Sequence, residues 1–179
     1  EDQFFKCQIL WGDAREKINI IPEANKFDLI YLDGFSPQKC PQLWTIEFLS
    51  KVTQKLKPQG YLITYSSSAA VRNTLRNLGL EIFTIKPSHN GSIFWSQGTV
   101  AIAKFDKNKF KTNLNFEKLS AMEEEHLLTK ASIPYKDQNL NSSKDDIIKK
   151  RLEEQLLSKL VSTKKWREKW GMTKSAFRS

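Results

Sequence analysis

The first 105 residues alternate between apolar runs and amphipathic segments. Continuous apolar runs of about four to eight residues are typical of strands that are covered on both faces of a sheet. Because strands that alternate with helices indicate a mainly parallel sheet, the pattern predicts an α/β fold, with the last two strands pairing as an antiparallel hairpin. The predicted strands are 4–10, 27–32, 61–66, 80–87 and 98–105, and the predicted helices are 14–21, 41–56 and 69–79.

The strand pattern ends there, and we expect a mostly helical extension over residues 106–179. One helix is predicted at 117–131. A long amphipathic helix is predicted at 142–170, with Ser142 or Ser143 as its N-terminal cap. The chain therefore divides, on its sequence, into an α/β part over residues 1–105 and this extension.

The long predicted helix has one apolar face, which is expected to dock on the rest of the protein. That face consists of Ile148, Leu152, Leu156 and Leu160. Near the end of the helix, Trp166 and Trp170 either stack on nucleic-acid bases or pack inside the protein, and we favour packing.

Charge changes this picture by indicating a partner. The chain has a net charge of +9, and its basic excess is larger after residue 105, where 17 basic residues stand against 11 acidic ones. A basic surface is typical of proteins that bind an anionic partner, most often nucleic acid. The alternative is that the charge serves only solubility.

Other classes of protein are disfavoured. No apolar run approaches the ~20 residues that span a bilayer, so we expect a cytoplasmic protein without a membrane partner. Cys7 and Cys40 lack the spacing of a metal site, and Cys7 is expected to be a small core residue in the first strand. No motif pairs His89 or His126, so neither is expected to be catalytic and no metal is predicted.

The candidate chemistry lies where the strand "FDLIYLD" ends at Asp33, before the turn "GFSP". Ligands of open α/β sheets bind at the carboxyl ends of the strands, so a carboxylate there is a candidate catalytic group. The alternative is an aspartate that only caps a turn. Ser66 and Arg72 follow the carboxyl end of the next strand, and Arg72 either contacts RNA or pairs with a carboxylate.

Three motifs together resemble the MnmC-type tRNA methyltransferases, in the stand-alone form without the flavin-dependent oxidase domain. They are "GDA", "YLDGFSPQKCPQLW" and "KPQGYLITYSSSAAVRNTLRNLGL". The resemblance implies a Rossmann-like class I methyltransferase sheet, S-adenosyl-L-methionine as cofactor and tRNA as partner. It also implies that the chain adds a methyl group to the 5-aminomethyl group of a wobble (thio)uridine. A related methyltransferase acting on another amine or RNA position is the nearest alternative.

The resemblance also implies roles for single residues. Asp33 would orient and deprotonate the amine, and the acidic side chain of Asp13 would contact the adenine amino group of the cofactor. Cofactor contacts are expected at Asp13, Ala14, Asp33 and Phe35. Substrate contacts are expected at Ser36, Pro37, Lys39, Trp44, Ser66 and Arg72. A helix-capping role for Asp13 and plain packing for Phe35 are the alternatives.

The departure from the family with the largest consequence concerns the cofactor loop. None of its seven glycines forms the Gly-x-Gly-x-Gly loop that binds the cofactor. We therefore expect residues 1–105 to be the C-terminal portion of the methyltransferase domain, lacking the half that carries the cofactor loop. As written, the chain should bind S-adenosylmethionine weakly or not at all. A catalytically silent RNA-binding remnant is the alternative.

Overall fold

A five-stranded sheet forms the centre of the computed structural model, which describes residues 6–24, 26–85, 97–106, 108 and 116–172. The strands are β1 (Phe27–Tyr31), β2 (Leu56–Thr64), β3 (Leu80–Ile85), β4 (Thr99–Ala103) and β5 (Phe116–Lys118). Their order across the sheet is β1-β2-β4-β3-β5. The helices are α1 (Ala14–Lys17), η1 (Pro41–Trp44), α2 (Ile46–Thr53), α3 (Ala69–Asn77), α4 (Ala121–His126), η3 (Lys130–Ser132), α5 (Lys144–Leu157) and α6 (Thr163–Lys169).

The strand pairing confirms the predicted α/β class. β1 and β2 are parallel, whereas β4 is antiparallel to both β2 and β3. It follows that β1, β2 and β3 run in one direction, with β4 inserted against them between β2 and β3. The predicted hairpin of the last two strands of the α/β part is thus present as β3–β4.

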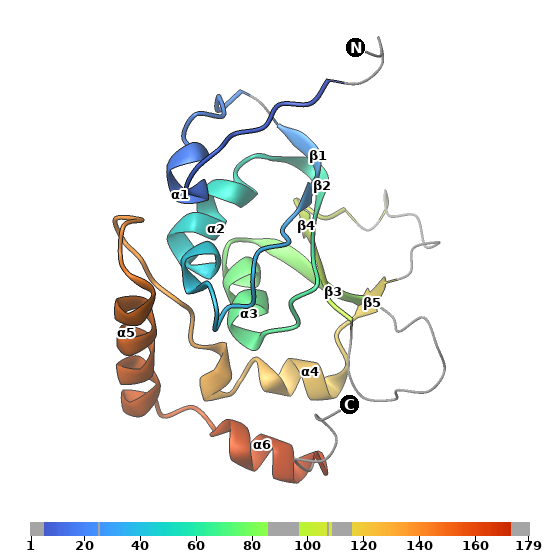
Figure 1. The fold of residues 1–179 in the computed structure, drawn as a ribbon. Coiled ribbons are helices and arrows are strands. Elements are labelled where there is room, and N and C mark those ends of the chain that lie inside the picture. Colours follow the sequence, from blue (N-terminus) through green and yellow to red (C-terminus); the bar gives the residue numbers. More distant parts are fainter. Residues whose placement is uncertain (1–5, 25, 86–96, 107, 109–115, 173–179) are drawn as a thin grey trace.

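The helices α1, α2 and α3 cover one face of the sheet, and the later helices continue around the same side and the lower edge of the molecule (Figure 1). The main core lies between the sheet and these helices, and Leu49, Leu62 and Leu75 are fully buried in it. Burying one such leucine stabilises the fold by about 1.5–3 kcal/mol. The extension contributes to the same core, through Leu119, Leu127, Tyr135 and Ile147.

Two of the predicted elements in the α/β part are wrong. Residues 6–12 contain no strand, and Cys7 is exposed, so neither the first strand nor a core position for Cys7 is found in the described part of that segment. The predicted helix 41–56 is interrupted at Thr45, which has extended backbone angles (φ −74°, ψ 154°). Its hydroxyl accepts a hydrogen bond from the Phe48 amide at 3.3 Å and caps α2, because a threonine side chain competes well for the free amides of a helix start.

The single long helix of the extension is also wrong. Ser143 caps α5 as predicted, but the helix ends before Ser158, whose backbone is extended (φ −69°, ψ 139°). A second cap, Ser162, starts α6 by accepting a hydrogen bond from the Lys165 amide. Ser158 and Ser162 stand at the two ends of a short linker. Serine side chains form hydrogen bonds with nearby backbone groups, and these bonds compete with those of a continuous helix.

The face that α5 turns inward differs from the predicted one. Leu152 is 52% exposed and Leu156 is 80% exposed, so the predicted apolar face does not dock. The inward face instead carries Ile147, Arg151 and Gln155, of which Ile147 is fully buried. Two polar side chains on this face donate hydrogen bonds to backbone carbonyls. The spacing of apolar residues in the sequence cannot predict such contacts.

The predicted packing of Trp166 is found. Its ring is buried and stacks on His126 at 4.1 Å between centroids, and its indole nitrogen donates to the Met122 carbonyl at 3.1 Å. Trp170 is half-buried and donates to Glu125. His89 lies outside the described residues.

The environment of His126 makes a prediction about acid stability. Burial, and then the charges of Arg72 and Arg167, lower its pKa from 6.5 to about 4. The unfolded chain therefore binds a proton near pH 6.5 that the folded chain does not bind until about pH 4, so stability is lost as pH falls through this window. We expect a loss of about 2–3 kcal/mol, a range that allows for partial exposure of the ring.

Urea unfolding measured from pH 7.5 to 4.5 tests this expectation. His126→Gln should flatten the dependence between pH 6.5 and 5, where carboxylates contribute little. An equally steep loss in that variant would assign the proton uptake to another group.

No helix in the described residues has the length and apolar content needed to cross a membrane. Within the same residues, no group of histidine, cysteine and carboxylate side chains is arranged to hold a metal ion.

Candidate active site

Asp33 lies at the carboxyl end of β1, in the loop that leads to η1. Backbone pairing with β2 continues one residue beyond the strand, because the Leu32 amide donates to the Ile63 carbonyl at 2.9 Å. The next residue, Asp33, is exposed. Its carboxylate forms no hydrogen bond or ion pair with any residue that the structure describes. It is therefore available to a ligand at the position where the sequence predicts a catalytic group.

Two aromatic side chains hold the backbone just after Asp33. The indole of Trp44 donates to the Phe35 carbonyl at 2.7 Å, and the hydroxyl of Tyr65 donates to the Gly34 carbonyl at 2.9 Å. The two rings pack edge to face, with centroids 6.5 Å apart. The loop is thus fixed by bonds to its main chain, which leaves the Asp33 and Phe35 side chains free to face outward.

The position of Trp44 corrects its predicted role. Its exposed fraction is 0%, so it offers no surface to a substrate and instead supports the loop. Gly34 fits closely over η1, since a Cβ at that position would lie 2.8 Å from a methyl carbon of Leu43. A larger residue there would require the Leu43 side chain to shift.

Tyr65 belongs to the motif that begins at Lys57, and the sequence alone predicts no role for its side chain. Partial burial, and then the charge of Asp33, raise the pKa of the Tyr65 hydroxyl above its usual value. The hydroxyl is therefore protonated at neutral pH and remains the donor that binds Gly34. The bond from Tyr65 to Gly34, the residue after Asp33, shows that the carboxyl ends of β1 and β2 lie close together.

The remaining loop residues differ in exposure. Phe35 is 78% exposed and Lys39 is exposed, so both can contact a ligand. Pro37 is buried, and together with Ser36 it lines a cavity of about 500 Å³ under the loop. The loop is tightened by the amides of Lys39 and Cys40, which both donate to the Ser36 carbonyl.

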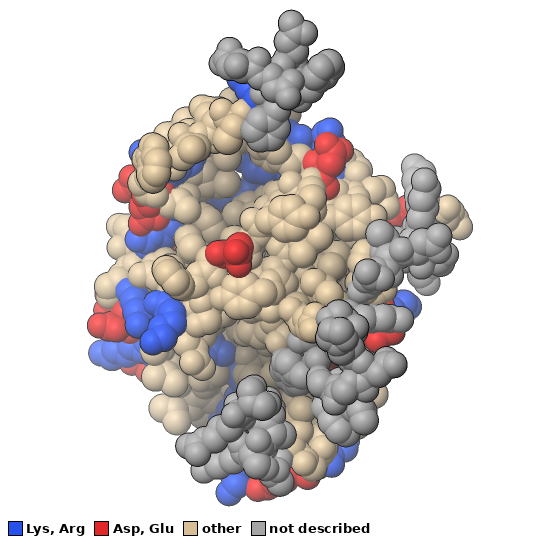
Figure 2. All heavy atoms as spheres, turned by 45° about the vertical axis from the view of Figure 1, so that its right-hand side comes forward, with Lys and Arg blue, Asp and Glu red and all other residues tan. Residues whose placement is uncertain are grey.

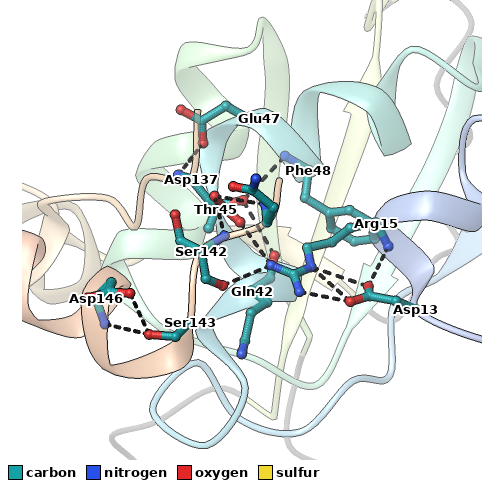
Figure 3. Close-up of polar contacts among 11 residues, drawn as sticks. Asp13, Arg15, Gln42, Thr45, Glu47, Phe48, Asp137, Ser142, Ser143 and Asp146 are labelled. Carbon is teal, nitrogen blue, oxygen red and sulfur yellow. Dashed lines mark hydrogen bonds and ion pairs between the residues drawn. The ribbon is translucent and has the colours of Figure 1, made fainter. Parts of the chain in front are cut away.

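Asp13 is held in a charged cluster that the sequence did not predict (Figure 3). Its carboxylate caps α1 by accepting from the Arg15 amide at 2.9 Å, and it pairs with the Arg15 guanidinium at 2.8 Å. Hydrogen bonds from that side chain lower the pKa of Asp13. The capping alternative is therefore observed, yet the Asp13 side chain is still 40% exposed and Ala14 beside it is exposed, so contact with a cofactor stays a prediction.

The same arginine connects this cluster to the extension. Arg15 pairs with the buried Asp137 at 3.0 Å. The Asp137 amide in turn donates to Glu47 at 2.8 Å, and the Ile46 amide donates to the Tyr135 carbonyl at 3.0 Å. Residues 135–137 therefore run beside the start of α2, just after Trp44, and also bind Arg15 beside Asp13.

The structure corrects the predicted substrate contact of Arg72, which is only 2% exposed. Its guanidinium pairs with Glu123 at 2.9 Å and donates to the Gly98 carbonyl at 3.0 Å and the Thr99 hydroxyl at 2.8 Å. Burial lowers the pKa of Arg72, and the charge of Glu123 opposes that effect. Of its two predicted roles, pairing with a carboxylate is the one observed.

Ser66 is also buried, with an exposed fraction of 5%. Its hydroxyl accepts a hydrogen bond from the Ser68 amide, and its carbonyl accepts one from Thr99. Like Arg72, it supports the sheet end from inside, which corrects the prediction that it contacts substrate.

Apolar side chains are exposed around the Asp33 loop. Figure 2 shows the molecule turned by 45° from the view of Figure 1, with the middle of the surface mostly uncharged and lysines and arginines mainly toward the margins. The exposed apolar residues along β1 and near its carboxyl end are Phe27, Leu29, Tyr31, Phe35 and Tyr65, with Phe27 at the opposite, amino end of the strand. An exposed carboxylate among aromatic rings can orient an amine while the rings contact a planar base.

Known proteins with similar sequences indicate the family of this chain. Residues 1–91 match the model of a family described as S-adenosyl-L-methionine-dependent methyltransferases. An uncharacterized protein of Methanocaldococcus jannaschii is 32% identical over 158 residues, which are 87% of this chain and 41% of that protein. The bifunctional MnmC protein of tRNA 5-methylaminomethyl-2-thiouridine biosynthesis from Campylobacter hominis is 29% identical over 60% of this chain and 17% of its own length.

A solved structure is also similar. The crystal structure of MnmC2 from Aquifex aeolicus has a TM-score of 0.69 and 31% sequence identity over 83% of this chain and 45% of that one. The chain thus spans less than half the length of these relatives.

Proposed function

The chain belongs to a family of S-adenosyl-L-methionine-dependent methyltransferases, and from this premise we propose that it methylates the 5-aminomethyl group of a wobble uridine in tRNA. The observation that carries the proposal is the exposed carboxylate of Asp33, held at the end of β1 by main-chain bonds from Trp44 and Tyr65. The relatives named for tRNA 5-methylaminomethyl-2-thiouridine biosynthesis support the choice of substrate.

The cofactor, when bound, supplies an electrophilic methyl group on a sulfonium. Two exposed side chains fit this group: Asp13 offers a carboxylate to an amino group, and Phe35 offers an aromatic face. Asp13 can serve both its cap and such a contact, because a carboxylate has more than one free acceptor site. Both residues are proposed contacts. The Asp13 contact is tested most directly by measuring how tightly the Asp13→Asn variant binds the cofactor.

Asp33 would prepare the amine for attack. An alkylamine with a pKa near 10.4 is mostly an ammonium ion at pH 7, and removing its proton costs about 4–5 kcal/mol. During transfer the new C–N bond forms as the C–S bond breaks, and the amine loses a proton. Asp33 can accept that proton and align the nitrogen, although its charge also favours the ammonium form, so alignment is the larger part of its role.

The proposal is tested with the full-length protein, because residues 1–179 lack the Gly-x-Gly-x-Gly cofactor loop. The protein is incubated with S-adenosylmethionine and tRNA, and the wobble nucleoside is analysed by mass spectrometry. A gain of one methyl group on the 5-aminomethyl substituent is expected. Binding of tRNA without any methyl transfer would favour the silent RNA-binding alternative, and methylation elsewhere would favour a related methyltransferase.

The basic surface of α6 is a proposed part of the tRNA contact. Lys164 and Lys165 are exposed, whereas Trp166 beside them is buried, so deleting the tail would disturb the core. We therefore use the double variant Lys164→Gln/Lys165→Gln. It should weaken tRNA binding and reduce the slope of log affinity against log salt by roughly 2, because two phosphate contacts no longer release counterions.

Fluorescence anisotropy with labelled tRNA at several salt concentrations measures this slope. Lys57→Gln is the control, because Lys57 is exposed but pairs with Asp28 beside β1, away from the extension. Equal losses per charge removed in both variants would mean that only net charge matters.

A further inference from the structure

A cavity of about 500 Å³ lies where three parts of the chain meet: the loop after Asp33, the start of α3 and the helical extension. Two arginines line it, and no aspartate or glutamate does among the residues that form its wall. The lining residues used below are Ser36, Pro37, Ser68, Tyr135, Arg151 and Arg167. The cavity is therefore a basic space that shares its wall with the candidate active site.

Arg151 is the main charged group of this wall. It donates to the carbonyls of Ile133 at 2.7 Å and Ala131 at 2.9 Å, and it lies over the ring of Tyr135 at 4.4 Å. No carboxylate in the described residues pairs with it, and its Nη1 has no hydrogen-bond partner there. Burial disfavours its charge and lowers its pKa. A partly buried guanidinium that faces a cavity and pairs with no carboxylate is stabilised when an anion binds in that cavity.

The start of α3 adds to the same field. Ser68 is its N-terminal residue, and the Ser68 side chain forms no capping hydrogen bond with the helix. The first amides of a helix carry partial positive charge and bind phosphate groups readily. Ser68 and Ala69 both line the cavity, so this helix end and Arg151 act on one space.

We propose that this cavity binds a backbone phosphate of the RNA substrate. The inference rests on the proposed function, because it takes the anion from the same nucleic acid. The planar guanidinium and the helix amides together offer several hydrogen-bond donors. A phosphodiester, with its several oxygens, is a better ligand for this set of donors than a single carboxylate is. Ser36 is three residues from Asp33, at most roughly 11 Å along the chain, so a bound phosphate would lie close to the nucleotide presented to Asp33.

The test uses two substitutions at one position. Ser68→Asp places a carboxylate in the cavity while keeping a favourable helix cap, and Ser68→Asn is its neutral match. Both variants should fold, as checked by thermal unfolding. We expect Ser68→Asp to bind tRNA at least 10-fold more weakly than Ser68→Asn and with a salt slope lower by roughly 1. Equal affinity of the two variants would overturn the proposal.

A second pair of variants removes charge instead of adding it. Arg151→Gln should lose affinity and salt slope, whereas Lys150→Gln, which removes the exposed neighbouring charge on the same helix, should change them less. A stem-loop RNA with one methylphosphonate near the wobble position should bind wild type and Ser68→Asp alike, because the phosphate that the cavity would bind is neutral. If that RNA keeps the full difference between them, the anion is not a backbone phosphate.

Amide NMR of Ala69 and Ala70 distinguishes the two possible sources of the anion, an RNA phosphate and free inorganic phosphate. RNA and inorganic phosphate are added separately as probes. Shifts with RNA that Ser68→Asp abolishes support the proposal, and shifts with inorganic phosphate only would replace it by a small-anion site. All of these measurements are made without cofactor. A failure of methylation with this binding pattern intact would therefore count against the proposed function alone.

Discussion

Asp33→Ala is expected to slow methyl transfer to tRNA severely and to leave tRNA affinity unchanged. The carboxylate is exposed and supports no described contact of the fold, so its loss should not disturb the loop that Trp44 and Tyr65 hold. A positioned acid–base group contributes about 10²–10⁴-fold to a rate, and we expect a loss in this range. Single-turnover transfer of labelled methyl, with the cofactor saturating, measures it.

Two further variants identify how Asp33 acts. Asp33→Asn keeps the shape and can still align an amine, but it accepts no proton at neutral pH. Substantial activity in this variant would mean that Asp33 acts mainly by aligning the amine. A complete loss of activity would mean that Asp33 acts mainly by accepting the proton. Asp28→Asn is the matched control, because Asp28 is an exposed carboxylate in β1, the strand that precedes Asp33. Full turnover in Asp33→Ala would contradict the proposed site.

The largest effect on stability is expected for Arg72→Met. This change leaves the buried Glu123 without its cation and removes the donors to Gly98 and Thr99. Breaking a buried ion pair from one side costs about 3–5 kcal/mol, because the remaining charge is uncompensated. Urea unfolding at pH 7 measures this loss.

Arg76→Met is the control for this prediction. Arg76 lies one turn further along α3 and pairs with Glu124, but both side chains are partly exposed, at 39% and 46%. A pair of this kind contributes about 0–1 kcal/mol. The double variant Arg72→Met/Glu123→Met should recover part of the loss, since no unpaired charge remains. Equal destabilisation by Arg72→Met and Arg76→Met would refute the role assigned to the buried pair.

Local patterns in the sequence predicted β1 to β4 and the loop after β1 well, whereas the predicted strand 4–10 is wrong over its described residues and β5 lies at the start of a segment predicted to be helical. The apolar runs that became β2, β3 and β4 are continuous, and the turn after Asp33 is coded by adjacent residues. The insertion of β4 between β2 and β3 was not predicted, because apolar runs carry no information on neighbour order.

Burial of polar residues was the main error. Arg72 is charged and follows a strand end, which favours a ligand contact, but its partner Glu123 is 51 positions away and no local pattern joins the two. The same holds for Arg15 and Asp137, which are 122 positions apart. On α5 the apolar spacing of Leu152 and Leu156 predicted the wrong face, because the inward contacts are made by polar side chains to carbonyls.

The placement of residues 135–137 beside α2 also has a consequence for biosynthesis. The segment that carries Asp33 leaves the ribosome long before Tyr135 and Asp137 are translated, so it emerges without the backbone partner of Ile46 and the ion partner of Arg15. Chains are made from the N-terminus at about 5–20 residues per second, so this interval lasts several seconds. Until the later segment arrives, nascent chains also lack the core residues Leu127, Tyr135 and Ile147, so we expect them to bind chaperones during translation.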